Sequence, residues 1–103
     1  MNKNKAKKLE KQGWRVGTVS EFLGLSVEEA RLIEIKLALS RALRTRRSKQ
    51  MTQAELARRL ASSQPRVAKA ENGDRSVSMD LLVRALLATG ATPKEIAREI
   101  ARL

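Results

Sequence analysis

Three polar side chains near the middle of the chain have types and spacing suited to pairing with nucleic-acid bases. Gln64 and Arg66 lie in the first turn of a predicted helix, and Lys69 follows one turn later. An amide can form two hydrogen bonds with adenine, and a guanidinium can form two with guanine. The unpaired N–H groups at the start of a helix also attract phosphate. This pattern predicts a helix end that enters the major groove of DNA.

The surrounding residues predict two short helices joined by a tight turn, over residues 52–73. Thr52 and Glu55 have the spacing of a capping box, and Ser63 can cap the second helix. Gly73 is a stop signal. The apolar residues expected to face inward are Leu56, Ala57, Leu60, Val67 and Ala70. The alternative is an ordinary pair of helices whose polar face meets only solvent.

Capping patterns predict further helices on both sides of this pair. A short helix begins at Thr18, a long one spans residues 26–47, and two more follow Ser78 and Thr92. Residues 33–39 alternate between apolar and other residues, which also fits a strand, but strong helix formers on both flanks favour the helix. The long helix has two apolar stripes, so we expect it to pack on two sides. The helix after Ser78 carries the apolar residues Met79, Leu82, Val83, Leu86 and Leu87, and the last helix is expected to bury Ile96, Ile100 and Leu103.

The composition excludes several classes of protein. The 103 residues include no Cys and no His, so disulfides, thiolate metal sites and the commonest general base are excluded. We expect no metal, no cofactor, no catalytic residue and no enzymatic activity. No apolar run approaches the ~20 residues of a membrane span, and no secretory signal follows the N-terminal lysines. These features predict a cytoplasmic protein that is not an enzyme and has no membrane partner.

The formal net charge of +11 indicates a polyanionic partner. The positive excess is concentrated in residues 1–15, with net charge +5, and in residues 36–75, with net charge +8. A solvated helix face could account for part of this charge. Its coincidence with the two-helix pattern favours contact with DNA phosphates. RNA is a less suitable partner, because aromatic side chains on which bases could stack are almost absent.

The segment TQAELARRLASSQPRVAKAENG, residues 52–73, resembles the helix-turn-helix of the Xre/Cro/CI family. That family includes lambdoid phage repressors and many bacterial antitoxins. The resemblance implies an all-α, lambda-repressor-like domain of five helices over residues 36–103. It also implies binding to double-stranded DNA. Many matched positions at fixed spacing make this signal specific.

The resemblance also assigns roles to individual residues. Gln53 matches a residue that contacts phosphate and supports the recognition helix, and Gln64 matches one that recognises a base. Arg46 and Glu71 match a structural salt bridge between the first domain helix and the end of the recognition helix. The full set of expected DNA-binding residues is Gln53, Ser63, Gln64, Arg66, Lys69, Arg47, Lys49 and Asn72.

The sequence departs from the family pattern at two positions. Ala61 stands at the turn position that is usually Gly, so the turn is expected to use a conformation that a Cβ tolerates. Pro65 stands where some relatives have a second polar residue that contacts bases. Recognition is therefore expected to depend on Gln64, Arg66 and Lys69.

The residues before the domain carry a second, less specific resemblance. Residues 1–12 are expected to be a disordered basic tail, and residues 13–35 a helical extension. The extension is similar to that of HigA-like antitoxins encoded beside HigB/RelE-type toxins. Its apolar residues could bind such a toxin or pack onto their own domain, and they are Trp14, Val16, Phe22 and Leu23.

Together these features predict a bacterial, nucleoid-associated transcriptional repressor. It is expected to bind a palindromic operator as a homodimer and to be the autoregulating antitoxin of a toxin–antitoxin pair. The alternative is a stand-alone phage-type or chromosomal repressor without a toxin partner.

Overall fold

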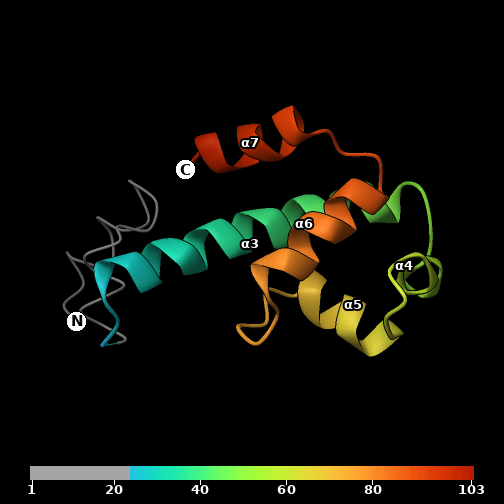
Figure 1. The fold of residues 1–103 in the computed structure, drawn as a ribbon, viewed down its shortest axis with the longest axis horizontal. Coiled ribbons are helices and arrows are strands. Elements are labelled where there is room, and N and C mark those ends of the chain that lie inside the picture. The colour runs from blue at the N-terminus through green and yellow to red at the C-terminus, as the bar shows by residue number, and fades with distance from the viewer. Residues whose placement is uncertain (1–23) are drawn as a thin grey trace, which may run out of the picture. The chain divides into compact units, whose positions relative to one another are not determined.

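The computed structural model describes residues 24–103, which form five helices and no strand (Figure 1). The helices are α3 (Val27–Ser48), α4 (Gln53–Arg59), α5 (Gln64–Glu71), α6 (Met79–Ala88) and α7 (Pro93–Ala101). The expected all-α fold class is confirmed. The basic tail, the helix beginning at Thr18 and the candidate partner-binding residues Trp14, Val16, Phe22 and Leu23 lie outside the described residues.

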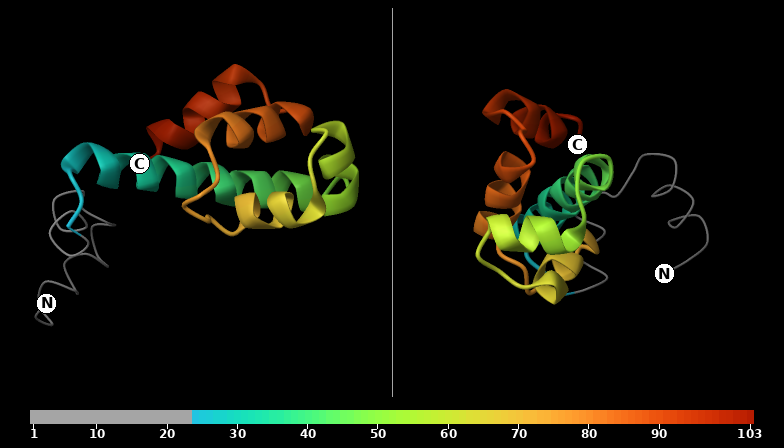
Figure 2. Two further views of the ribbon diagram at one scale, coloured as in Figure 1. Left: turned by 60° about the horizontal axis from the view of Figure 1, so that its bottom comes forward. Right: turned by 90° about the vertical axis from the view of Figure 1, so that its right-hand side faces the viewer.

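The chain divides into two units after Glu34, and the second unit, Ile35–Leu103, contains most of α3 and all the other described helices. In this unit α5 and α7 lie on opposite sides of α3 and α6, as three views agree (Figures 1 and 2). The α4–α5 pair is therefore remote from α7.

Local sequence signals account for where the helices begin. Thr52, Ser63, Ser78 and Thr92 have extended backbone conformations, and each side-chain oxygen accepts a hydrogen bond from the backbone N–H three residues later. Each such cap stabilises a helix by about 1 kcal/mol. Only the Thr92 cap is a complete capping box, because Glu95 also accepts from the Thr92 N–H.

The alternation in residues 33–39 does not produce a strand, because α3 passes through the whole segment. Leu39 and Leu43 of α3 are fully buried in the core of the second unit, while Leu32 and Leu37 stay exposed. Ala30, before the division, is buried against Leu25.

The core of the second unit contains side chains from all five helices. Its fully buried large residues are Leu39, Leu43, Leu56, Val67, Leu82 and Leu86. The expected burial of Leu103 is wrong, because this residue is 51% exposed, and Leu87 of α6 is 46% exposed. Leu81 and Ala85 fill the core side of α6 instead, and Leu103 lies beyond the end of α7.

Three successive helices end in the same way. After α4 the Ala61 N–H donates to Arg58 O and the Ser62 N–H to Ala57 O, which is the hydrogen-bond pattern of a Schellman motif. The matching left-handed positions after α5 and α6 are Gly73 and Gly90, with φ of +74° and +91°. Ala61 also adopts the left-handed conformation, with φ of +51°. A Cβ tolerates this conformation only at a cost of about 1–2 kcal/mol.

We predict that Ala61→Gly stabilises the fold by about 1 kcal/mol. The substitution removes the energetic cost of the left-handed backbone at Ala61. Part of this gain, ~0.5–1 kcal/mol, is lost again because Gly has more conformational freedom than Ala in the unfolded chain. The midpoint of thermal unfolding should rise by ~4–8 °C.

The matched control is Ala97→Gly, at an exposed position inside α7. There the same change should lower the midpoint, because helical Ala carries no such strain. A lower midpoint in Ala61→Gly as well would show that the left-handed alanine costs nothing.

Candidate nucleic-acid interface

The outer face of α5 presents the polar side chains that the sequence singled out. Gln64, Arg66, Lys69 and Asn72 are exposed, and within residues 24–103 none of their side chains makes a hydrogen bond or ion pair. Val67 and Ala70 of the same helix are 1% exposed. The helix is thus held by one face, and the polar side chains of the other face are free to bind a ligand.

The start of α5 has the cap that the sequence predicted. Ser63 Oγ accepts a hydrogen bond of 3.3 Å from the Arg66 N–H, and Pro65 lies in the first turn, where its missing N–H breaks no helical bond. Of the other first-turn residues, Val67 donates its N–H to Ser63 O, so the Gln64 N–H is the one that a phosphate oxygen could accept.

The start of α4 and the start of α5 border one open hollow. It has a volume of about 700 Å³ and lies beside the α3–α4 turn. Its lining includes Arg47, Lys49, Gln53 and Gln64, four of the eight expected DNA-binding residues. Ser48, Gln50 and Thr52 also line it, although sequence reasoning did not select them as contacts; their place between Arg47 and Gln53 was the available signal. The structure therefore brings together residues from α3, α4 and α5 around one surface depression.

A buried carboxylate lies beneath this surface. The Glu71 side chain is 2% exposed, and Arg47 donates to its two oxygens from Nε at 2.6 Å and from Nη2 at 2.8 Å. Gln53 Nε2 donates to Glu71 Oε1 at 3.1 Å. The remaining Arg47 nitrogen, Nη1, donates to Met51 O at 3.3 Å. One carboxylate thus joins the end of α3, the start of α4 and the end of α5.

The expected salt bridge between Arg46 and Glu71 is therefore wrong by one residue. Arg46 instead pairs with Glu95 of α7, with 3.1 Å between Nη1 and Oε2, and donates from Nε to Thr89 Oγ1 at 3.2 Å. Successive side chains of a helix point about 100° apart, so neighbouring arginines face different partners. Arg47, expected to contact DNA, uses all three guanidinium nitrogens inside the protein.

The surroundings of Glu71 determine its ionisation. Burial alone would raise the pKa of its carboxyl, but hydrogen bonds from Arg47 and Gln53, with the charges of Arg47 and Arg44, outweigh burial and lower the pKa. Glu71 therefore stays charged at neutral pH. Arg44, which sequence reasoning did not select, is exposed and unpaired within the described residues; its place one turn before Arg47 was the available signal.

Among residues 24–103 no cluster of three or more carboxylates is placed to hold a metal ion. None of the described helices is long and apolar enough to cross a membrane.

A protein-family model described as helix-turn-helix matches residues 41–96, just over half of the chain. The match spans α4, α5, α6 and part of both α3 and α7. No curated protein and no solved structure matches the chain.

We predict that Glu71→Ala destabilises the second unit by about 3–5 kcal/mol, because it leaves the half-buried Arg47 guanidinium without its counterion. Chemical denaturation measures the free energy of unfolding. The control is Glu95→Ala, which removes the half-exposed pair with Arg46 and should cost about 1 kcal/mol, plus its part of the Thr92 capping box. A double-mutant cycle should give a large coupling energy for Arg47 with Glu71 and none for Arg46 with Glu71.

The lowered pKa of Glu71 predicts acid sensitivity. A carboxyl with a lower pKa in the folded protein contributes stability that is complete above its unfolded pKa of 4.5 and is lost as pH falls through the folded value. The free energy of unfolding should therefore be level above about pH 5 and fall below it. Glu71→Gln should be less stable at pH 7 and show a shallower decrease in acid. An unchanged slope in Glu71→Gln would assign the acid sensitivity to other carboxyls, such as Asp74, whose pKa is lowered by hydrogen bonds from Ser76.

Proposed function

Since the chain belongs to the Xre-like helix-turn-helix family, whose members bind DNA, we propose that it is a sequence-specific transcriptional repressor. The observation that carries this proposal is the outer face of α5, where Gln64, Arg66 and Lys69 are exposed and unpaired while the inner face is fixed in the core. A helix whose backbone is already fixed suits the major groove, because only its side chains have to be ordered on binding.

Three exposed side chains of α5 contact DNA in the proposed complex. Gln64 pairs with an adenine and Arg66 with a guanine, because an amide and a guanidinium match those base edges. Lys69, one turn further on, binds a base or a phosphate. With Pro65 supplying no polar group, recognition depends on these three residues.

The residues around α5 position the duplex through its backbone. In the proposed complex Lys49, Gln53, Ser63 and Asn72 contact phosphate, and the backbone N–H of Gln64 at the start of α5 adds to them. Arg47 is not among these contacts, because its nitrogens are already bonded to Glu71 and Met51. Its role in the proposal is to hold α5 in place.

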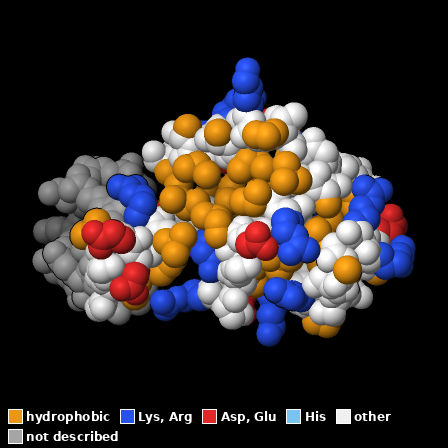
Figure 3. All heavy atoms as spheres, in the orientation of Figure 1, with side chains coloured by type: hydrophobic (Ala, Val, Ile, Leu, Met, Phe, Trp, Pro, Cys, Tyr) orange, Lys and Arg blue, Asp and Glu red, His pale blue; other side chains and the backbone are white. Residues whose placement is uncertain are grey.

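The proposed repressor acts as a homodimer on a palindromic operator. Figure 3 shows hydrophobic side chains gathered over α6 and α7, and half-buried apolar residues of these helices include Met79, Val83 and Ile100. Pairing two copies through this face would remove apolar surface from water and leave α5 free in both. Two recognition helices then contact half-sites about 34–36 Å apart.

We further propose that the protein is an autoregulating antitoxin, located in the bacterial cytoplasm and associated with the nucleoid. It is supported by the similarity of residues 13–35 to the extensions of HigA-like proteins. Trp14, Val16, Phe22 and Leu23 are the proposed toxin-binding residues. Co-purification with a small ribonuclease-like product of the neighbouring gene tests this role. Failure to co-purify would leave the stand-alone phage-type or chromosomal repressor.

We predict that Gln64→Ala weakens binding to the protein's own promoter by about 1–3 kcal/mol and relaxes specificity at one base position. Lys49→Ala should weaken binding to all sequences alike and reduce the salt slope by about one. Quantitative gel shifts and footprinting at several salt concentrations measure both effects.

The matched control for the α5 face is the pair Arg66→Ala and Arg98→Ala. Both arginines are exposed and unpaired within the described residues, but Arg98 lies on α7, remote from α5. Only Arg66→Ala should weaken specific binding. Equal losses in the two variants, or no footprint with the native chain, would contradict sequence-specific recognition by α5.

A further inference from the structure

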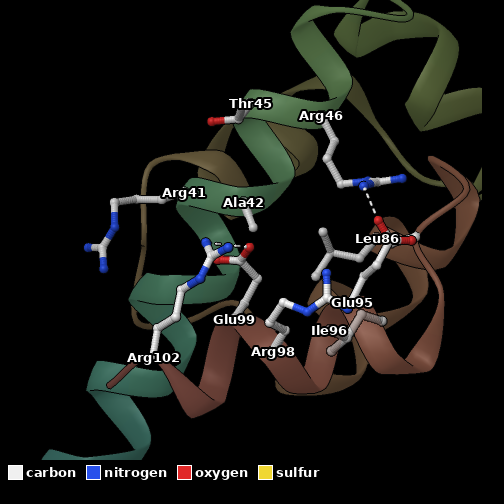
Figure 4. A pocket seen from close by; sticks show the side chains of 11 residues that line it. Arg41, Ala42, Thr45, Arg46, Leu86, Glu95, Ile96, Arg98, Glu99 and Arg102 are labelled. Atoms are coloured by element: carbon white, nitrogen blue, oxygen red, sulfur yellow. Dashed lines mark hydrogen bonds and ion pairs between the residues drawn. The ribbon is translucent and has the colours of Figure 1, made fainter.

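A second cationic site lies on the side of the second unit away from α5. It is a pocket of about 340 Å³ between α3, α6 and α7 (Figure 4). Arg46 of α3 points toward Glu95 of α7 across it, while the Arg41 side chain at its edge extends away from α7. Its volume falls within the range of small-molecule sites.

The pocket combines an apolar base with a cationic rim. Leu86, Ala91 and Ile96 are buried residues that form its base, with Ala42 beside them. Four arginines and only two carboxylates line the rest, so its net charge is positive; they are Arg41, Arg46, Arg98, Arg102, Glu95 and Glu99.

The arginines differ in how they are held. Arg46 is fixed by Thr89 and Glu95, which leaves its Nη2 without a hydrogen bond among the described residues. Arg102 pairs with Glu99 at 3.0 Å. Arg41 and Arg98 are exposed and make no hydrogen bond or ion pair within residues 24–103. Two guanidiniums can therefore turn toward a ligand, while a third is already oriented.

DNA bound to α5 would not account for this charge. Because α7 and α5 lie on opposite sides of α3 and α6, a duplex on α5 does not reach the pocket (Figures 1 and 2). Phosphate contacts act over only about a Debye length, ~8 Å, at physiological salt. DNA on α5 would therefore leave the cationic rim of this pocket without a phosphate contact.

We propose that this pocket binds a small organic dianion, with its carboxylates or phosphate on Arg41, Arg46 and Arg98 and an apolar body against Leu86 and Ile96. Guanidinium groups bind carboxylate and phosphate oxygens in pairs, which gives geometric selectivity as well as attraction. The apolar base adds affinity that a bare inorganic ion cannot obtain. This site is separate from the proposed DNA contacts and does not require them.

The test is a titration of the full chain, followed by the backbone amide signals in two-dimensional NMR at constant ionic strength. The probes are phenyl phosphate, phthalate and inorganic phosphate. Phenyl phosphate or phthalate should bind saturably, with a dissociation constant of about 1 mM or tighter, and shift the amides of Thr45, Arg46, Ala91 and Arg98. The stronger of these two probes shows whether the pocket prefers a phosphate or a dicarboxylate head group. Inorganic phosphate, which has no apolar body, should bind several-fold more weakly.

Variants separate this site from the DNA face. Arg41→Gln combined with Arg98→Gln should weaken the binding of the better probe about tenfold or more without changing the thermal midpoint, because neither side chain is bonded within the described protein. The matched control, Arg66→Gln, should leave probe binding unchanged. Shifts confined to α4 and α5, an equal loss in Arg66→Gln, or no saturable binding would overturn the proposal.

Discussion

The geometry of α5 depends on the buried charge of Glu71. A carboxylate that is removed from water costs several kcal/mol unless its oxygens are hydrogen-bonded. Here Arg47 supplies two donors and a compensating charge, and Gln53 supplies a third donor. These donors come from α3 and from the start of α4. The charge is therefore compensated only when three helices meet in one arrangement, so the interaction specifies that arrangement as well as stabilising it.

This constraint explains how so short a helix can present a fixed surface. Eight residues do not form a stable helix alone, so α5 needs tertiary contacts. Val67 and Ala70 supply apolar packing and Glu71 supplies the ionic contact, all on the inner side. Because the inner side provides the stability, Gln64, Arg66 and Lys69 are not needed for folding. The residue types at these three positions can therefore suit a ligand without loss of stability.

The sequence was a good guide where a feature depends on neighbours along the chain. The caps at Thr52, Ser63, Ser78 and Thr92 were predictable, because a cap involves residues only three positions apart. The partner of Glu71 was not, because Arg46 and Arg47 differ only in helical phase, and the phase is set by packing across helices. The backbone conformation of Ala61 could not be predicted from its residue type, because alanine disfavours the left-handed region. The Schellman hydrogen bonds after α4 impose that conformation.

Gln53 connects the buried network to the proposed interface. A side-chain amide has two N–H donors, and Gln53 uses one bond from Nε2 to hold Glu71. The other N–H remains for a phosphate oxygen at the hollow that Gln53 lines with Lys49. Because Glu71 fixes the position of Nε2, that second N–H is already oriented in the free protein, and the proposed phosphate contact would lose less side-chain entropy. A carboxylate buried for the sake of the fold thus also orients a hydrogen-bond donor at the proposed interface.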